Sequence, residues 1–267
     1  MPESDNRRSD DLAGKVVLVS GGTQGLGAAV ARAAARAGAD IALTGRRREV
    51  GESFAAELAA ETGREVSFTA ADVADVAQAT VVVRHAVERF GGVDCLVNVA
   101  GFTERGTLLD TTPELFDRHI AVNLKAPFFM MQEVVADLRR RGQPGSIVNV
   151  ISMSAHGGQP YLAPYVAAKA GLAGLTRNAA HAHRWDRIRI NGLNIGWTLT
   201  EGEDATQKRF HDADDDWAEQ AAAAQPMGRL GDPDEIAQAV VFLLSDRSGV
   251  VTGSVIDWDQ QVRGAYD

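Results

Sequence analysis

Tyr165 and Lys169 are spaced so that they could share a proton. They lie four residues apart within residues 161–183, an alanine-rich segment that favours helix, so both side chains would project from one helix face. A free phenol has a pKa near ~10 and is a poor base at neutral pH, but a nearby ammonium group favours the phenolate and lowers that pKa. The pair therefore predicts a tyrosine that gives and takes a proton. The alternative is a tyrosine and a lysine that meet on a solvated helix face.

A glycine-rich turn near the start of the chain predicts a second part of the site. Residues 15–20, K-V-V-L-V-S, are typical of a strand buried on both faces, and an alanine-rich helix follows the turn and ends at Gly38. Glycines let the backbone approach a ligand closely, and the helix N-terminus offers free N–H groups to a pyrophosphate. The spacing is G-x-x-x-G-x-G rather than G-x-G-x-x-G, and a merely structural turn is the alternative. The predicted cofactor contacts are Gly21, Thr23, Gln24, Gly25, Leu26 and Gly27.

The ends of the second and third predicted strands bear on which cofactor binds. Residues 40–44 are followed by Gly45 and three arginines, Arg46 to Arg48, at the place where an acid would bind a ribose 2′-hydroxyl. An arginine pairs with a 2′-phosphate, so Arg46 favours NADP(H) and leaves NAD(H) as the alternative. At least one of the three arginines is expected to be an exposed surface residue that does not bind the cofactor. Asp72 and Val73 follow the strand at residues 66–70, where the carboxylate could reach an adenine. A turn or N-cap aspartate is the competing interpretation.

The remaining segments complete a sheet and bring further polar residues to one edge. Strands are predicted at residues 93–97, 147–151, 187–193 and 253–258, each separated by helical sequence. The fourth strand leads into Asn98-Val99-Ala100-Gly101, and the fifth delivers Ser152, with Ser154 as its rival. We expect one α/β domain over residues 12–267: a Rossmann-type, doubly wound, seven-stranded, mostly parallel sheet with helices on both faces. Residues 1–11 are expected to be a disordered tail and residues 198–226 an acidic substrate-loop insertion.

Composition excludes several classes of function. The formal net charge of −9 argues against a nucleic-acid partner and gives no support to an anionic membrane surface. No apolar run is long enough for a membrane span, and the charged N-terminus is unlike a secretory signal. Cys95 is the only cysteine and lies in an apolar run, which favours a core residue over a nucleophile. These features predict a cytoplasmic protein, and no cluster of metal ligands is visible.

Taken together, the motifs resemble those of the short-chain dehydrogenase/reductase family over essentially the whole chain after the tail. The glycine turn is similar to T-G-x-x-x-G-x-G with Ser20 for the threonine, and Asn98-Val99-Ala100-Gly101 resembles N-N-A-G. Ser152 stands thirteen residues before Tyr165, the family's spacing for its catalytic serine, and Tyr165 and Lys169 match Y-x-x-x-K. Asn123 matches the family's helix asparagine. Without the resemblance, an asparagine inside a helix predicts either a kink with a water or an ordinary polar contact.

The resemblance implies a mechanism and a set of contacts. A nicotinamide cofactor presents hydride to a carbonyl, Tyr165 carries the proton, and Lys169 lowers the tyrosine pKa and holds the ribose. Ser152 would bond the substrate oxygen, and Asn123 would hold a water that links Lys169 to solvent. Further cofactor contacts are implied at Asn98, Ala100, Gly101, Gly196, Thr198 and Thr200, and the family implies a homotetramer.

The substrate is the least constrained part of the prediction. The family's substrate wall would be formed here by His156, Gln159, Trp197 and the acids Glu201, Glu203 and Asp204. Polar groups beside one flat aromatic side chain suit a sugar or polyol. The acids would repel a carboxylate or phosphate if they face the pocket, and a position on the solvent face is the alternative. A steroid-like or acyl ketone, a cofactor-sensing regulator without turnover, and a nucleotide-fold methyltransferase are the alternatives. Two departures from the family concern loops: Ile195-Gly196 replaces P-G, and Asp259-Gln260-Gln261 replaces D-G-G.

Overall fold

The computed structural model describes residues 11–262. The tail expected at residues 1–11 therefore lies outside the described residues, apart from Asp11. Asp11 accepts a hydrogen bond of 2.9 Å from Arg247, so the chain is anchored from this residue onward.

Seven parallel strands form one sheet in the order β3-β2-β1-β4-β5-β6-β7. The strands are β1 (Val16–Ser20), β2 (Asp40–Gly45), β3 (Val66–Ala70), β4 (Cys95–Asn98), β5 (Gly145–Val150), β6 (Ile188–Ile195) and β7 (Val255–Trp258). The expected fold class is thus confirmed, and the described sheet is parallel throughout. Because β1 lies beside β4, the strand order reverses between them, and the carboxyl ends at such a switch point form a crevice for ligands.

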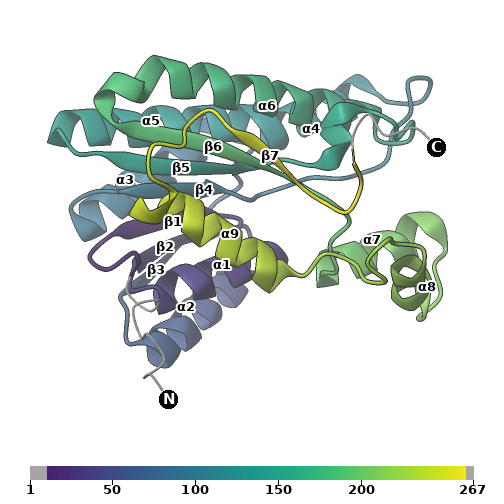
Figure 1. Ribbon diagram of the computed structural model, residues 1–267, viewed down its shortest axis with the longest axis horizontal. Coiled ribbons are helices and arrows are strands. Elements are labelled where there is room, and N and C mark those ends of the chain that lie inside the picture. Colours follow the sequence, from purple (N-terminus) through teal and green to yellow (C-terminus); the bar gives the residue numbers. More distant parts are fainter. Residues whose placement is uncertain (1–10, 263–267) are drawn as a thin grey trace.

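Helices cover both faces of the sheet (Figure 1). The helices α1 (Gly25–Arg36), α2 (Arg48–Thr62) and α9 (Pro233–Leu244) lie on one face, and α3 (Val76–Phe90), α5 (Ala126–Arg141) and α6 (Ala163–His183) lie on the other. Strand residues alternate between the two cores: Val17 and Val19 pack with α1 and α9, whereas Leu18 packs with α3 and α5. Burial on both faces explains the continuous apolar runs of these strands.

Cys95 is a buried core residue, as its sequence context predicts. It packs among the aliphatic side chains of one face, and burial raises the pKa of its thiol to about 12. A thiol held in its neutral form is a poor nucleophile, so Cys95 contributes packing rather than chemistry.

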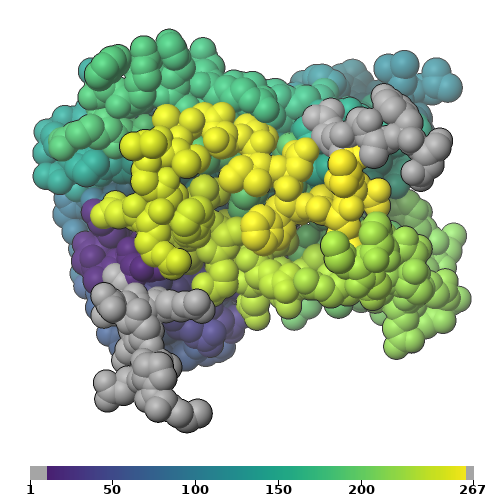
Figure 2. All heavy atoms as spheres, in the orientation of Figure 1, coloured from purple at the N-terminus to yellow at the C-terminus, as the bar shows by residue number. Residues whose placement is uncertain are grey.

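Two short helices, α7 (Glu201–His211) and α8 (Trp217–Ala223), project beyond the carboxyl edge of the sheet (Figure 1). They occupy the stretch in which we expected an acidic insertion. On the surface, the last described residues cross one face of the molecule and meet the segment after α8 (Figure 2). Gln260 makes this connection, because it accepts a hydrogen bond from Met227 N and donates one to the carbonyl of Arg229.

The helical segment between β4 and β5 is interrupted. Helix α4 (Pro113–Ile120) continues into a π-helical turn, Ala121–Lys125, before α5 begins. Asn123 lies in this turn and is completely buried. π turns widen a helix by one residue per turn and occur often at functional sites.

Within residues 11–262, no helix has both the length and the apolar character that crossing a membrane requires. The same residues contain no group of three or more histidine, cysteine, aspartate or glutamate side chains that could hold a metal ion.

Gly27 is expected to tolerate no side chain. A Cβ at this position would lie 2.0 Å from the carbonyl oxygen of Gly21, and backbone cannot yield as a flexible side chain can. Gly27→Ala should therefore lower the free energy of unfolding by about 3 kcal/mol, the upper range for overpacking, as measured by urea denaturation. Gly174→Ala is the matched control, because a Cβ there meets no atom within 4 Å in helix α6 and should leave stability equal or higher. Equal stability of the two variants would contradict the prediction.

Candidate active site

A cleft of about 900 Å³ runs along the carboxyl edge of the sheet. Its walls come from the turn after β1, the ends of β2, β3 and β4, the segment after β5, helix α6 and the loop between β6 and α7. Most of the predicted site residues line it: Gly21, Thr23, Gln24, Gly25, Leu26, Gly27, Arg46, Asp72, Val73, Ala100, Gly101, Ser152, Tyr165, Lys169, Gly196, Trp197, Thr198 and Thr200. The fold thus brings together segments that are far apart in the chain.

The glycine turn is shaped for an anionic ligand. Gly21 has a φ of 72°, and a Cβ there would lie 2.8 Å from the Cα of Ala100, so glycine is required by both conformation and space. Helix α1 begins at Gly25 without a side-chain cap and with no acidic residue in its first turn, which leaves its N–H groups free. A close backbone cradle with uncapped donors fits the diphosphate of a nicotinamide dinucleotide.

The three arginines after β2 have different environments. Arg46 and Arg47 line the cleft beside Gly45 and Thr23, and Arg47 donates a hydrogen bond to the side-chain oxygen of Gln24. Arg48 instead pairs with Glu52 at 3.1 Å along the exposed side of α2. Arg48 is therefore the surface arginine that the sequence led us to expect among the three.

Asp72 lines the cleft but is already paired. Its carboxylate accepts hydrogen bonds from Arg118 at 2.9 Å and from the backbone N–H of Ala74 at 3.1 Å. Asp72 therefore has the turn role that was one of our two interpretations, and its contact with an adenine stays a prediction. Arg118 also lines the cleft and was not singled out from the sequence, because its partner lies 46 residues away.

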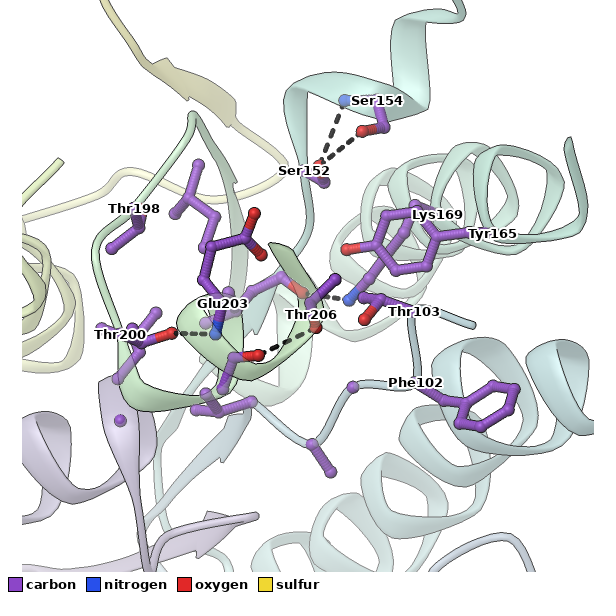
Figure 3. Close-up of a pocket in the computed structure, with 18 of the residues that line it drawn as sticks. Phe102, Thr103, Ser152, Ser154, Tyr165, Lys169, Thr198, Thr200, Glu203 and Thr206 are labelled. Carbon is purple, nitrogen blue, oxygen red and sulfur yellow. Dashed lines mark hydrogen bonds between the residues drawn. The ribbon is translucent and has the colours of Figure 1, made fainter. Parts of the chain in front are cut away.

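Tyr165 and Ser152 lie together at the end of the cleft that is formed by helix α6 and the segment after β5 (Figure 3). The hydroxyl of Tyr165 points into the cavity, and the residue itself is buried. Ser152 forms a hydrogen bond with Tyr165, accepts one from Ser154 N at 3.1 Å and lies 3.1 Å from the hydroxyl of Ser154. Ser152 is therefore the serine beside the tyrosine, and Ser154 supports it.

The pKa of Tyr165 differs from the sequence-based expectation. Burial raises it to about 12, because the phenolate loses solvation, and the charge of Glu203 raises it further. The hydrogen bond with Ser152 and the charge of Arg105 act in the opposite direction. Lys169 is not among the groups that lower the pKa of Tyr165, although the sequence predicted that it would be. The phenol therefore stays protonated at neutral pH.

Lys169 is buried beside the tyrosine ring. Its Nζ lies 5.7 Å from the centre of that ring and donates a hydrogen bond of 2.8 Å to the carbonyl of Val150. Burial lowers the pKa of this amine to about 8, because desolvation disfavours its charge. Desolvation thus pushes the pKa values of Tyr165 and Lys169 in opposite directions.

Asn123 fastens the segment after β4. Its Oδ1 accepts from Phe102 N at 3.0 Å, and its Nδ2 donates to the Phe102 carbonyl at 2.8 Å. The side chain therefore makes the ordinary polar contact that was one of our two expectations. The proton-relay role implied by the family stays a prediction.

His119 is a buried residue that sequence reasoning missed. Its Nε2 lies 3.0 Å from the Glu104 carbonyl, which can only accept, so Nε2 carries the proton and Nδ1 faces Asn123 Nδ2 at 3.4 Å. Burial lowers the pKa of His119 and favours this neutral ring. The ring centre lies 6.2 Å from that of Tyr165, so His119 packs against the tyrosine. Its spacing of four residues from Asn123 was the available signal.

Two predicted contacts point away from the cleft. The side chain of Asn98 is buried at the end of β4, where its Nδ2 donates to Asn149 Oδ1 at 2.8 Å. His156 lies 3.0 Å from Asp257 Oδ1 and 3.0 Å from Asn194 Nδ2, both at the β6–β7 edge. Neither residue lines the cleft, because each finds polar partners on neighbouring strands that the sequence does not place beside it.

Helix α7 closes over the cleft through contacts with the opposite wall. Arg105 lines the cleft and makes hydrogen bonds to His211 at 2.9 and 3.2 Å and to the Thr103 carbonyl at 2.9 Å. The His211 ring also packs edge-on against Tyr161 at 5.4 Å. Arg105 was not singled out from the sequence, although it follows the Gly101 turn at the ligand-binding edge.

Known proteins identify the family of the chain. The family model described as Enoyl-(Acyl carrier protein) reductase matches residues 21–260. This chain belongs to the short-chain dehydrogenase/reductase family. L-rhamnose 1-dehydrogenase (NAD(P)(+)) of a Sphingomonas species is 38% identical over 246 residues, which cover 92% of this chain and 94% of that protein. A 3-oxoacyl-[acyl-carrier-protein] reductase of Chlamydia trachomatis is 31% identical over 93% of this chain and 97% of its own length.

Among solved structures, L-sorbose reductase from Gluconobacter frateurii, complexed with NADPH and L-sorbose, superposes with a TM-score of 0.90. It is 28% identical and covers 97% of this chain and 100% of that chain. As a member of the short-chain dehydrogenase/reductase family, the present chain is an NAD(P)-dependent oxidoreductase that acts on a small-molecule alcohol or carbonyl. The family resemblance drawn from the sequence is confirmed.

The departures from the family's loop motifs have visible consequences. A Cβ at Gly196 would meet Asp259 Oδ1 at 1.9 Å, so this glycine is needed where the loop after β6 passes β7. Ile195 stands before this glycine in place of the family's proline, and the residues after Gly196 pair with Gly231. Gly231 N donates to the Trp197 carbonyl, and Leu199 N donates to the Gly231 carbonyl. These hydrogen bonds hold the loop in place of a proline ring.

Proposed function

We propose that this enzyme transfers hydride between NADP(H) and a secondary hydroxyl or ketone of a sugar or polyol. One observation carries the proposal: a single cleft has Tyr165, Ser152 and Lys169 at one end and the glycine turn with Arg46 at the other. The cofactor supplies the hydride when it is bound, and the remaining chemistry belongs to the chain.

In this proposal Ser152 binds the substrate oxygen and Tyr165 exchanges a proton with it. A phenol with a pKa raised to about 12 is protonated at neutral pH, which is the form that donates to a carbonyl oxygen as charge develops there. At neutral pH the tyrosine therefore holds the proton that reduction of a carbonyl needs. Lys169 would orient the cofactor ribose and, when charged, favour the phenolate needed for the reverse reaction.

The preference for NADP(H) rests on Arg46. Arg46 is exposed in the cleft beside Gly45, and no carboxylate stands at the end of β2 to repel a 2′-phosphate. Relatives support the nicotinamide cofactor, since one is named for NAD(P)(+) and the structure of another is complexed with NADPH. NAD(H) remains the alternative cofactor.

Arg46→Ala is expected to weaken NADPH binding by about tenfold and to leave NADH binding unchanged, because only NADPH carries the phosphate that a charged hydrogen bond would hold. Parallel fluorescence titrations with both cofactors measure this. The matched control is Arg48→Ala, whose guanidinium pairs with Glu52 outside the cleft. Equal losses for NADPH and NADH, or equal effects of the two variants, would contradict the assignment.

The sugar or polyol class rests on the polar character of the substrate end. Polar side chains gather there, namely Gln159, Glu203, Thr206, Gln207, Gln225 and Gln261. L-rhamnose and L-sorbose in the names of two relatives support the same class, whereas an acyl substrate in the name of another is the alternative. Initial rates with NADP⁺ and polyols, or with NADPH and ketoses, test the proposal; activity confined to acyl thioesters would oppose it.

The assembly and location stay predictions. Phe116 and Phe128 are 42% and 43% exposed on α4 and α5, which is consistent with the expected homotetramer. Sedimentation of the purified enzyme would measure the number of subunits. A cytoplasmic location rests on composition alone.

A further inference from the structure

Glu203 lies in the wall of the cleft and is held there by hydrogen bonds with residues that precede and follow it in the chain. It lies in the first turn of α7, where its N–H donates to the capping hydroxyl of Thr200 at 3.1 Å. Its Oε1 accepts one hydrogen bond from Trp197 Nε1 at 2.8 Å and another from Gln207 Nε2 at 2.7 Å. Two donors on one oxygen fix the orientation of the carboxylate.

The carboxylate faces the reacting end of the cleft. Glu203 lines the cavity, and Figure 3 shows its carboxylate and the hydroxyl of Tyr165 directed into the same space. The negative charge is close enough to Tyr165 to act on the titration of its phenol. Among the described residues no partner is found for Oε2, so this oxygen is available to a ligand.

Nearby basic groups are already engaged. Arg105, the arginine of the cleft wall that also acts on Tyr165, is bound to His211 and to the Thr103 carbonyl. Glu203 makes no ion pair with the described residues, so its charge remains available to the cleft. A half-buried carboxylate accepts hydrogen bonds strongly from neutral hydroxyls and repels another anion.

We propose that Glu203 selects the substrate: its free oxygen binds a second hydroxyl of an uncharged polyhydroxylated substrate, and its charge excludes carboxylates and phosphates. This inference rests on the proposed function and names the feature that the substrate must carry. The Glu203 carboxylate would distinguish uncharged sugars and polyols from sugar acids and sugar phosphates of the same length. Glu203 is one of three acids whose orientation the sequence left open; Glu201 is exposed outside the cleft, and Asp204 is bound to Trp217.

The test is Glu203→Gln, which keeps an oxygen for Trp197 and Gln207, removes the charge and puts an NH2 donor where the free acceptor oxygen stood. Rates with NADP⁺ are measured on a neutral panel (D-sorbitol, D-mannitol, xylitol and L-rhamnose), on D-gluconate, and on cyclohexanol, which has one hydroxyl. We expect the wild type to prefer the neutral panel. In the variant KM for its best neutral substrate should rise about tenfold relative to KM for cyclohexanol, and the disadvantage of D-gluconate should shrink.

Two further readouts separate selection from folding. The variant should keep the NADPH affinity and melting temperature of the wild type, and its pH–rate profile should shift to lower pH, since a negative charge near Tyr165 has been removed. Glu201→Gln is the matched control on the same helical turn and should change none of these quantities.

The outcomes distinguish this inference from the proposed function. Unchanged ratios among the neutral panel, D-gluconate and cyclohexanol in Glu203→Gln would overturn the role of Glu203 and leave the oxidoreductase intact. A wild-type preference for D-gluconate would also overturn it. Absence of turnover with every alcohol and both cofactors would overturn the proposed function itself, and the inference with it.

Discussion

Tyr165→Phe is expected to lower turnover by at least about 100-fold, the range for loss of a proton donor positioned at the reacting oxygen. The ring stays in place, so packing against His119 and the fold should be retained. Because only the hydroxyl is lost, NADPH affinity should remain within about twofold of the wild type by fluorescence titration. Steady-state kinetics on the best substrate of the polyol screen measures the loss.

The structure adds a pH dependence to this expectation. Since the pKa of Tyr165 is raised to about 12, the phenol stays protonated throughout the neutral range. Loss of its proton should therefore not slow the reduction reaction as the pH rises from 6 to 8. Oxidation needs the phenolate and should rise with pH over the same range. Full activity of Tyr165→Phe in either direction would remove Tyr165 from the mechanism.

Lys169→Met is the second large expected effect, and it separates activity from stability. Methionine has a similar length and suits the buried site, but it carries no charge for the phenolate and no donor for a ribose. Turnover should fall by about 100-fold, and KM for the cofactor should rise. Retained turnover with retained cofactor KM would contradict both proposed roles of the lysine.

The same variant should change how stability depends on pH. The pKa of Lys169 is about 8 in the folded chain and near 10.5 as an ordinary lysine, so between these values the unfolded chain holds more protons. Stability of the wild type therefore rises with pH across this window, by about 3 kcal/mol for this group. The difference in free energy of unfolding, wild type minus variant, should increase by that amount between pH 7 and 10.5. Urea denaturation at both pH values measures it, and a constant difference would mean that Lys169 is solvated.

Much of the fold and of the cleft could be predicted because the signals are local. The apolar runs of β1 and β2 lie within a residue of their expected positions, since strands buried on both faces need continuous apolar sequence. The glycine turn was recognisable because Gly21 and Gly27 have no room for a Cβ, a requirement that leaves its mark on the sequence. Tyr165 and Lys169 could be paired because helix periodicity alone places them on one face.

Contacts between distant segments could not be predicted in this way. Asn98 and His156 have side chains that suit a ligand site, yet each is bound by a residue of a neighbouring strand, Asn149 and Asp257 respectively. Arg118 and His119 enter the site from α4, a helix whose sequence carried no family motif for them. The partners of a polar side chain depend on strand order and helix packing, which single residue types do not encode.

The sequence by itself determined the kinds of chemistry available to this protein: a dinucleotide cradle, a serine, a tyrosine and a lysine at the carboxyl edge of a parallel sheet. Only the tertiary structure decided the protonation states of these groups and the direction of the Glu203 carboxylate. Burial, not the neighbouring lysine, dominates the pKa of Tyr165, and the folding of α7 over the cleft turns the Glu203 carboxylate toward it. Desolvation and the direction of a side chain are properties of the packed chain, because both depend on which distant residues exclude water from the site.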